Sequence, residues 1–341
     1  MKTVYVTDVK DGLCMGLSTL FNQVIQIDCG CQYDPKAAFD GLKRLFQHFR
    51  QIDYFVLSHF HADHYNGLLY STNLSPSFRP YSLKKVFFPR IPKFSESRQF
   101  ELCLYVMNER LFGSETGSRE ADFLNTVKKL NVSNFSYRPL SKGDAVMING
   151  SRFEVLWPPR TFRDNDKTLA PVRRAIRLFD DAKETDREIQ RLYEQLYAQT
   201  LWPNEEGVVE KSESPERNGQ STLQRRDIPE TVKKANEALN DAANHLSLVL
   251  CEGNRFIFWG DAERSEIKEI ATELISNERS TFYIAVTPHH GTHWHKILTE
   301  MSFVFAVSSN GPKLVAHTKP FKEISQRALS TFINGEMELT T

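Results

Sequence analysis

The sequence predicts an α/β fold, because short apolar runs typical of buried strands alternate with segments that carry a helical repeat of apolar residues. Residues 54–57 and 246–251 show the first pattern, since both runs are apolar, favour strand and have no helical period. Residues 34–49 show the second, with apolar side chains three and four positions apart. With 40% apolar residues among 341, the chain can bury a substantial core, and we expect one domain over residues 1–341.

The charge and cysteine content exclude several classes of protein. The 43 basic and 43 acidic residues give a formal charge of zero, so any binding of nucleic acid would need a local basic patch. The five cysteines have no C-x-x-C spacing, which argues against a disulfide framework. No apolar run approaches the roughly 20 residues that a membrane span needs, and the first residues lack the features of a signal peptide. We therefore expect a cytoplasmic protein that does not bind membranes.

The first 50 residues predict a β-meander followed by a helix. Strands are expected at residues 3–7, 12–20 and 23–28, separated by turn residues that include Gly12 and Gly30. Asp28 ends the third strand, where it could bond its own backbone as a turn residue or support a nearby site. The helix is expected over residues 34–49.

The most informative stretch follows the strand at residues 54–57 and contains three histidines and an aspartate within six positions. His59 and His61 would point to one side of an extended chain, and Asp63 and His64 follow where the chain must turn. Imidazole and carboxylate groups are ligands that Zn²⁺ and similar divalent ions prefer. The cluster therefore predicts half of a site for two metal ions.

The middle of the chain predicts ordinary scaffold elements. A Ser/Pro-rich loop is expected at residues 74–81, a short strand at 84–89, and helices at 98–111 and 120–130. A further strand is expected at residues 152–157, and it should stop at Pro158.

Residues 161–243 have a more charged composition and are expected to form a helical and loop insertion. Helices are predicted at residues 180–197 and 228–243, and a mobile polar loop at residues 205–226. Arginines lie at its edges, either as a solvated face or as a patch that contacts phosphate groups of a substrate: Arg173, Arg174, Arg177, Arg225 and Arg226. The insertion could also bind a protein partner.

A second cluster of polar residues follows the strands of the C-terminal third. The runs at residues 246–251 and 255–259 predict a hairpin around Gly253, and Asp261 follows the second strand directly. Asp261 could be a metal ligand or the N-cap of a helix expected over residues 262–274.

The strand predicted at residues 282–287 ends in four histidines within seven residues, which are too many for a core. They are His289, His290, His293 and His295. A strand at residues 303–307, then His317, and a closing helix at residues 321–333 complete the prediction.

The string H-x-H-x-D-H at residues 59–64 resembles the signature of the metallo-β-lactamase fold superfamily. This resemblance implies a four-layer αβ/βα sandwich and a hydrolase with one or two metals at its edge. Five shorter strings resemble the hydrolase domain attached to ComEC-type DNA-uptake proteins, among them Pro288-His289-His290-Gly291-Thr292. The opening string departs from that group around Lys10, and the glycine that precedes the histidine equivalent to His317 is missing.

The resemblance also implies roles for the polar residues around two divalent ions, Zn²⁺ or Mn²⁺. Asp261 would bridge both ions, and Asp28 would support the ligands. The other implied ligands are His59, His61, Asp63, His64, His245 and His289, with Asn244 as the alternative to His245 and His290 as the alternative to His289. Asp63, His290 and His317 are expected to act in catalysis, with His293 or His295 as alternative proton donors to His317.

Hydrolysis of a phosphodiester, most specifically of DNA by a nuclease, is the leading functional hypothesis. The neutral net charge favours the first alternative, a hydrolase of a small molecule such as a cyclic nucleotide, ester, lactone or thioester. The second alternative is a non-catalytic scaffold that uses the insertion to bind a partner. A redox role would need a flavin domain, for which the chain has no fingerprint.

Overall fold

The computed structural model describes residues 2–74, 79–113, 122–199, 201–210 and 228–340, and its strands form two sheets. The first sheet has the order β15-β1-β2-β3-β4-β5-β6-β9. Its strands are β1 (Thr3–Val6), β2 (Gly12–Ser18), β3 (Val24–Cys31), β4 (Tyr54–Val56), β5 (Lys85–Pro89), β6 (Phe135–Leu140), β9 (Gly207–Val209) and β15 (Met337–Thr340).

The second sheet is formed by strands from the later part of the chain and has the order β14-β13-β12-β11-β10-β8-β7. Its strands are β7 (Ala145–Ile148), β8 (Ser151–Trp157), β10 (Val249–Glu252), β11 (Phe256–Phe258), β12 (Thr281–Val286), β13 (Ser302–Ser308) and β14 (Ser325–Ser330).

The two sheets pack face to face, because alternate residues of each strand belong to a common apolar layer. Val56 of β4 lies in the same hydrophobic cluster as Phe256 and Phe258 of the second sheet. Their neighbours Phe55 and Ile257 point the other way and pack in the cluster that includes the helices. Each sheet is therefore covered by its partner sheet on one face and by helices on the other, which confirms the predicted α/β sandwich.

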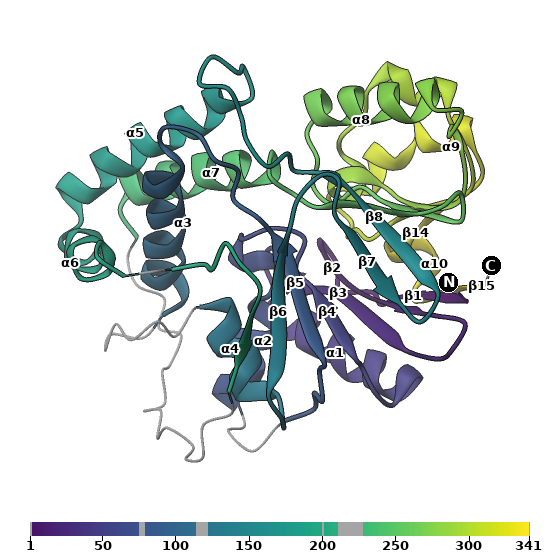
Figure 1. Ribbon diagram of the computed structural model, residues 1–341, viewed down its shortest axis with the longest axis horizontal. Coiled ribbons are helices and arrows are strands. Elements are labelled where there is room, and N and C mark those ends of the chain that lie inside the picture. The colour runs from purple at the N-terminus through teal and green to yellow at the C-terminus, as the bar shows by residue number, and fades with distance from the viewer. Residues whose placement is uncertain (1, 75–78, 114–121, 200, 211–227, 341) are drawn as a thin grey trace.

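Helices cover the outer faces of the sheets and one end of the molecule (Figure 1). The first sheet is covered by α1 (Pro35–Phe49), α2 (Asn66–Leu74) and α4 (Phe123–Leu130), and the second by α8 (Arg264–Ser276) and α9 (Phe321–Ile324). Four further helices gather at one end: α3 (Ser97–Phe112), α5 (Leu169–Thr185), α6 (Arg187–Leu196) and α7 (Glu230–Asn244). None of the described helices has the length and hydropathy of a membrane span.

Strand direction determines where polar loops can meet. Strands β3 to β6 run parallel to one another, and so do β11 to β14. The carboxyl ends of parallel strands lie at the same edge of a sheet, which is where open α/β sheets bind their ligands. The loops after β4, β11 and β12, which carry the polar clusters predicted from the sequence, leave their sheets at such edges.

The end of the chain differs from the predicted closing helix at residues 321–333. Helix α9 stops at Ile324, β14 then pairs in parallel with β13, and a short helix α10 (Thr331–Asn334) leads into β15. Strand β15 pairs with β1, at the opposite end of the sequence. Met337 and Leu339 are buried because they face the core at every second position. Long-range pairing, which has no local signal, decides the conformation of this segment.

The helix predicted at residues 180–197 is in fact two helices. Asp186 separates α5 from α6, and its carboxylate accepts hydrogen bonds from the amides of Glu188 and Ile189 as the N-cap of α6. The same carboxylate forms a buried ion pair with Arg110 of α3, with Nη2 and Oδ2 2.8 Å apart. The turn is therefore stabilised both by a cap and by a charge from another helix.

Several elements in the middle of the chain were missing from the prediction. Strands β6 and β7 and helix α2 have no counterpart in it, and β9 lies inside the loop predicted at residues 205–226. Strand β9 is ordered by pairing with β6, with Val208 opposite Ser136. Residues 211–226 of the predicted loop, and 75–78 of the earlier one, lie outside the described residues.

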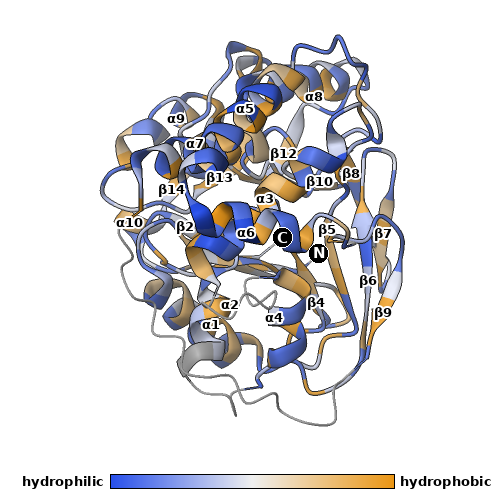
Figure 2. Ribbon diagram, turned by 90° about the vertical axis from the view of Figure 1, so that its left-hand side faces the viewer, coloured by the Kyte–Doolittle hydropathy of each residue, from blue (hydrophilic) through white to orange (hydrophobic). Residues whose placement is uncertain are grey.

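The helices between residues 161 and 243 pack into the main core. Phe179 of α5 and Leu192 of α6 are buried in the same hydrophobic cluster as Phe100 of α3. Figure 2 shows hydrophilic and hydrophobic positions alternating along α5 and α6, as expected for helices with one face on the core. The boundaries of the insertion, 161–243, stay a prediction.

Candidate metal centre

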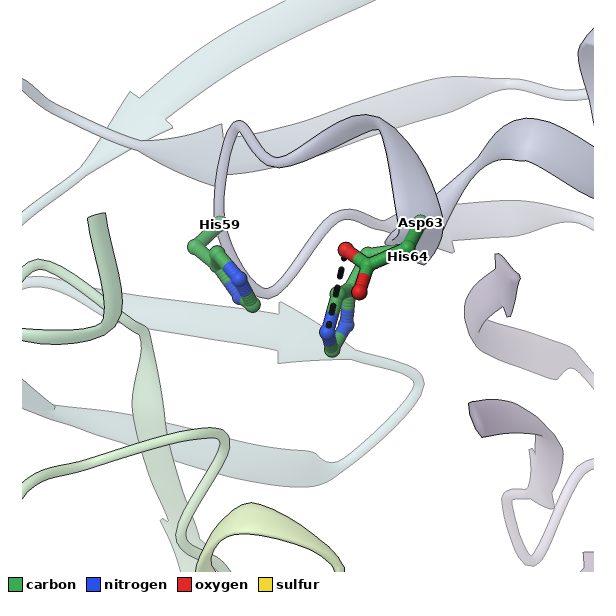
Figure 3. A group of neighbouring side chains, drawn as sticks. All are labelled: His59, Asp63 and His64. Atoms are coloured by element: carbon green, nitrogen blue, oxygen red, sulfur yellow. Dashed lines mark ion pairs between the residues drawn. The ribbon is translucent and has the colours of Figure 1, made fainter. Parts of the chain in front are cut away.

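The loop after β4 brings three metal-binding side chains together. Ligand atoms of His59, Asp63 and His64 all lie within 4.8 Å of one another. Figure 3 shows these side chains projecting from one loop, with an ion pair between Asp63 and His64. The loop turns tightly because Ala62–His64 form a 3-10 turn, in which the His64 amide bonds the carbonyl of His61 at 3.0 Å.

Asp28 of β3 fixes the conformation of this loop through hydrogen bonds. Its carboxylate accepts hydrogen bonds from the backbone amide of Ser58 at 2.7 Å and from the Ser58 hydroxyl at 2.6 Å. It also accepts a bond from Nδ1 of His64 at 2.8 Å. Asp28 is fully buried, so these bonds replace its hydration. Asp28 thus holds the proton on Nδ1 of His64. Burial lowers the pKa of His64, but Asp261 and Asp28 outweigh it and the net pKa is raised, so a cation would displace the proton from Nε2.

The loop after β11 places Asp261 against this group. Oδ2 of Asp261 lies 3.3 Å from Nε2 of His64. Glycine is required at residue 260 for the turn before Asp261, because its φ of 54° is unfavourable for other residues. A Cβ atom there would also lie 2.7 Å from the carbonyl oxygen of Leu248, which is too close. Glu263, and not Asp261, occupies the N-cap position of α8. The alternative prediction that Asp261 is a helix cap is therefore wrong.

The loop after β12 places two histidines close to the carboxylate of Asp261. Nε2 of His289 lies 3.6 Å from Oδ2 of Asp261, and Nε2 of His290 lies 3.9 Å from it. Both histidines have positive φ, 46° and 58°, which is a conformation that costs free energy and is concentrated at functional sites. The His289 amide bonds the carbonyl of Gly260 at 2.9 Å, which links the two loops. His64, Asp261 and His290 form a second group with ligand atoms within 4.8 Å.

The electrostatics of the centre are dominated by buried carboxylates among imidazoles. Burial opposes ionisation of Asp261, but His64, His289 and His290 hold the pKa of that carboxyl well below its usual range. For Asp63, His61 and His64 likewise outweigh burial and lower the pKa. Burial lowers the pKa of His289 to about 4, so this imidazole is neutral at physiological pH. The centre therefore offers ionised carboxylates beside imidazoles, which would bind a metal ion in their neutral form.

The donor set fits divalent metal ions. Nε2 of His59 is buried and has no hydrogen-bond partner among the described residues. Burial, followed by the charge of His64, keeps the pKa of His59 well below its usual range. A buried imidazole nitrogen without a partner is costly, and coordination to a cation would satisfy it. His59 and Asp63 would help to hold one ion, His64 and His290 would help to hold the other, and the carboxylate of Asp261 could serve both.

Besides His289, three of the residues predicted as metal ligands or catalytic groups lie outside both groups. His61 contacts the carboxylate of Asp63 through Nδ1. Nδ1 of His245 lies 2.9 Å from Oε1 of the buried Glu266 and forms a hydrogen bond with this carboxylate. His317 is exposed in the 3-10 turn Val315–Thr318. The roles predicted for these three residues stay predictions.

The predicted arginine patch is only partly available to a ligand. Arg173 is paired with Glu96, with Nε and Oε1 2.9 Å apart. Arg174 and Arg177 are exposed on α5 and form no ion pair with a described residue. Arg225 and Arg226 lie outside the described residues.

The sequence prediction missed a third group, formed by Glu263, His289 and His293, whose ligand atoms also lie within 4.8 Å. Glu263 follows Asp261 by two positions, and His293 follows His289 by four. A carboxylate close to a histidine cluster in space, but on a different loop, has no signal in the spacing of the sequence.

The pairing of His245 with Glu266 predicts a pH-dependent contribution to stability. Burial lowers the pKa of His245, but Glu266 outweighs it and the net pKa is raised. The contribution is therefore complete below the unfolded pKa of about 6.5 and is lost as pH rises through the raised folded value. In wild type, the free energy of unfolding measured in chelator should fall as pH rises through this range, with a slope of at most about 1.4 kcal/mol per pH unit. In His245→Gln this pH-dependent fall should be absent. An unchanged pH profile, or loss of bound metal from the variant, would contradict the assignment of His245 to Glu266.

Comparisons with known proteins give similarities of fold at low identity. No protein-family model matches the chain, and no curated protein matches it. The chain is similar to the metallo-beta-lactamase fold protein YhfI from Bacillus subtilis, at 8% identity and a TM-score of 0.42, with 100% of both chains covered. It is also similar to a beta-lactamase domain protein from Burkholderia ambifaria, at 16% identity and a TM-score of 0.24, over 42% of this chain and 40% of that one.

A flavodiiron core from Synechocystis sp. PCC6803, Flv1, is similar at 11% identity and a TM-score of 0.23, over 96% of this chain and 90% of that one. Because each TM-score is below 0.5, these similarities add no argument about function. The metal centre is inferred from the side chains of this chain alone.

Proposed function

We propose that this protein is a metal-dependent hydrolase whose two divalent ions, Zn²⁺ or Mn²⁺, are held by the groups around His64 and Asp261. The observation that carries the proposal is one buried carboxylate, Asp261, that faces three imidazoles beside the His59, Asp63 and His64 group. Two ions in such a centre would lower the pKa of a bound water to about 7 and stabilise the attacking and leaving oxygens of a hydrolytic displacement.

The residues of the chain position the reaction. Asp28 holds the Nδ1 proton of His64, so that Nε2 is the atom that would bind a cation, and the positive φ of His290 directs its imidazole toward Asp261. Asp63 and Asp261 supply ionised carboxylates, which compensate the charge of the ions. His317 lies on an exposed turn, from which it could protonate a leaving group after a substrate binds.

A phosphodiester is the substrate class that we propose, with DNA as its most specific form. A cationic patch formed by Arg264, Lys268 and Lys296 supports this choice. All three are exposed, form no ion pair with a described residue and belong to α8 and the adjacent 3-10 turn Lys296–Glu300. After the effect of burial, their charges lower the pKa of His295, so the four groups share one region next to the loops that carry Asp261 and His289.

Charge removal distinguishes this patch from the arginines of α5. If DNA binds the patch, the variant Arg264→Gln, Lys268→Gln, Lys296→Gln should raise KM for DNA. It should also flatten the salt dependence by about 0.9 in the log–log slope for each lost contact with duplex phosphate. Turnover of bis-p-nitrophenyl phosphate should be unchanged, because the metals alone hold so small an ester. The matched variant Arg174→Gln, Arg177→Gln tests the surface predicted from the sequence.

Three outcomes contradict the nuclease proposal. DNA cleavage could be absent while a cyclic nucleotide, ester, lactone or thioester is turned over, which would favour a small-molecule hydrolase. Cleavage of DNA could be insensitive both to salt and to the two sets of substitutions. A protein that binds metal but hydrolyses none of these substrates would favour the non-catalytic scaffold.

A further inference from the structure

The third group of potential ligands lies outside the centre described above and uses different atoms. Glu263 precedes α8, and His289 and His293 belong to the loop that follows β12. All three side chains are half-buried, so a solvent ion could reach them. The Nε2 atom of His289 faces Asp261 at 3.6 Å, whereas its Nδ1 atom faces His293 on the other side of the ring.

Two of the donor-atom distances in this group match those of a tetrahedral metal site. Nδ1 of His289 lies 3.3 Å from Nδ1 of His293, and Nδ1 of His293 lies 3.5 Å from Oε2 of Glu263. Metal–ligand bonds of about 2.0–2.1 Å at tetrahedral angles separate the donor atoms by roughly 3.3–3.5 Å. Two imidazoles and one carboxylate are also a known ligand set for zinc, with a fourth position open to water.

A chain of hydrogen bonds is the competing arrangement of the same side chains. Nδ1 of His289 lies 2.8 Å from Nε2 of His293, and Nδ1 of His293 lies 3.1 Å from the carbonyl oxygen of Ala262. A cation bound by the two Nδ1 atoms would replace both of these bonds. The two arrangements therefore exclude each other, and metal binding decides between them.

We propose that Glu263, His289 and His293 form an outer site for one borderline divalent ion such as Zn²⁺, separate from the inner pair. Because a neutral imidazole has one lone pair for coordination, His289 binds the outer ion through Nδ1 and leaves His290 to complete the inner group with His64 and Asp261. The proposal does not depend on hydrolysis, since it concerns the number and position of bound ions.

Equilibrium titration with Zn²⁺, followed by elemental analysis of the full chain, tests the outer site. Wild-type protein should bind one equivalent more than His293→Ala and one more than Glu263→Gln. His295→Ala is the matched control, because it removes a histidine two positions away whose Nδ1 accepts a bond from the Ile297 amide. It should bind as many equivalents as wild type. Melting curves recorded in chelator check that each variant is folded.

Asp63→Ala separates the two sites, because it should lower the affinity of the inner centre and retain the outer equivalent. Equal metal content and equal affinity in wild type, Glu263→Gln and His293→Ala would overturn the outer site and favour the hydrogen-bond chain. That result would leave the proposed hydrolase intact, whereas normal inner binding by Asp63→Ala would count against the proposed function and not against the outer site.

Discussion

Asp261→Asn is expected to lower the rate of hydrolysis at least about 100-fold and to reduce the metal content of the protein. The expectation follows from the position of Asp261, whose Oδ2 atom faces three imidazole nitrogens at 3.3 to 3.9 Å. Loss of a residue that only supports a ligand costs about 10–100-fold in metal affinity or activity, and loss of a shared ligand should cost at least as much. The amide also lacks the charge that compensates two cations.

Elemental analysis and hydrolysis of bis-p-nitrophenyl phosphate check this prediction in the same preparation. A melting curve in chelator shows whether the variant is folded before metal is added. Wild-type metal content together with wild-type turnover in Asp261→Asn would exclude Asp261 from the centre, and the chemistry would have to lie elsewhere.

Asp28→Asn should weaken metal binding by about 10–100-fold, although Asp28 touches no ion in the proposed arrangement. Its carboxylate accepts bonds from the Ser58 amide, the Ser58 hydroxyl and Nδ1 of His64. An asparagine can present its amide hydrogens to His64, which would favour the tautomer with the proton on Nε2. That tautomer cannot bind a cation through Nε2.

Asp53→Asn is the matched control for Asp28. Asp53 is also a buried carboxylate between the same strands, where it accepts a bond from the Val24 amide at 3.0 Å and pairs with Lys84 at 2.9 Å. It lies at the start of β4, whereas the metal centre follows the end of that strand. Asp53→Asn should reduce stability and leave metal affinity unchanged. Equal losses of affinity in both variants would mean that Asp28 acts only through general stability.

The sequence was most informative where a site is built from consecutive residues. The spacing from His59 to His64 after a buried strand, and of Asp261 after a strand and Gly260, predicted two of the three loops that meet at the centre. The histidine cluster predicted the third loop. The number of histidines could not show which atoms face Asp261, because that depends on the positive φ of His289 and His290.

Long-range contacts account for the parts that sequence reasoning missed. Strand β15 forms because it pairs with β1, and the break at Asp186 is stabilised by Arg110 of another helix. The pairing of His245 with Glu266 depends on how α7 meets α8. In each case the deciding partner is distant in sequence, so no local pattern identifies it.

The most direct test of the metal centre is anomalous diffraction at the absorption edge of Zn²⁺ or Mn²⁺ from crystals of the reconstituted protein. Two peaks about 3.5–4 Å apart should lie among the inner ligands, separate from the peak expected at the outer site. One should contact His59 and Asp63, the other His290, with Asp261 between them. The absence of any peak within bonding distance of Asp261 and His64, in protein that retains its fold, would contradict the proposed dinuclear centre.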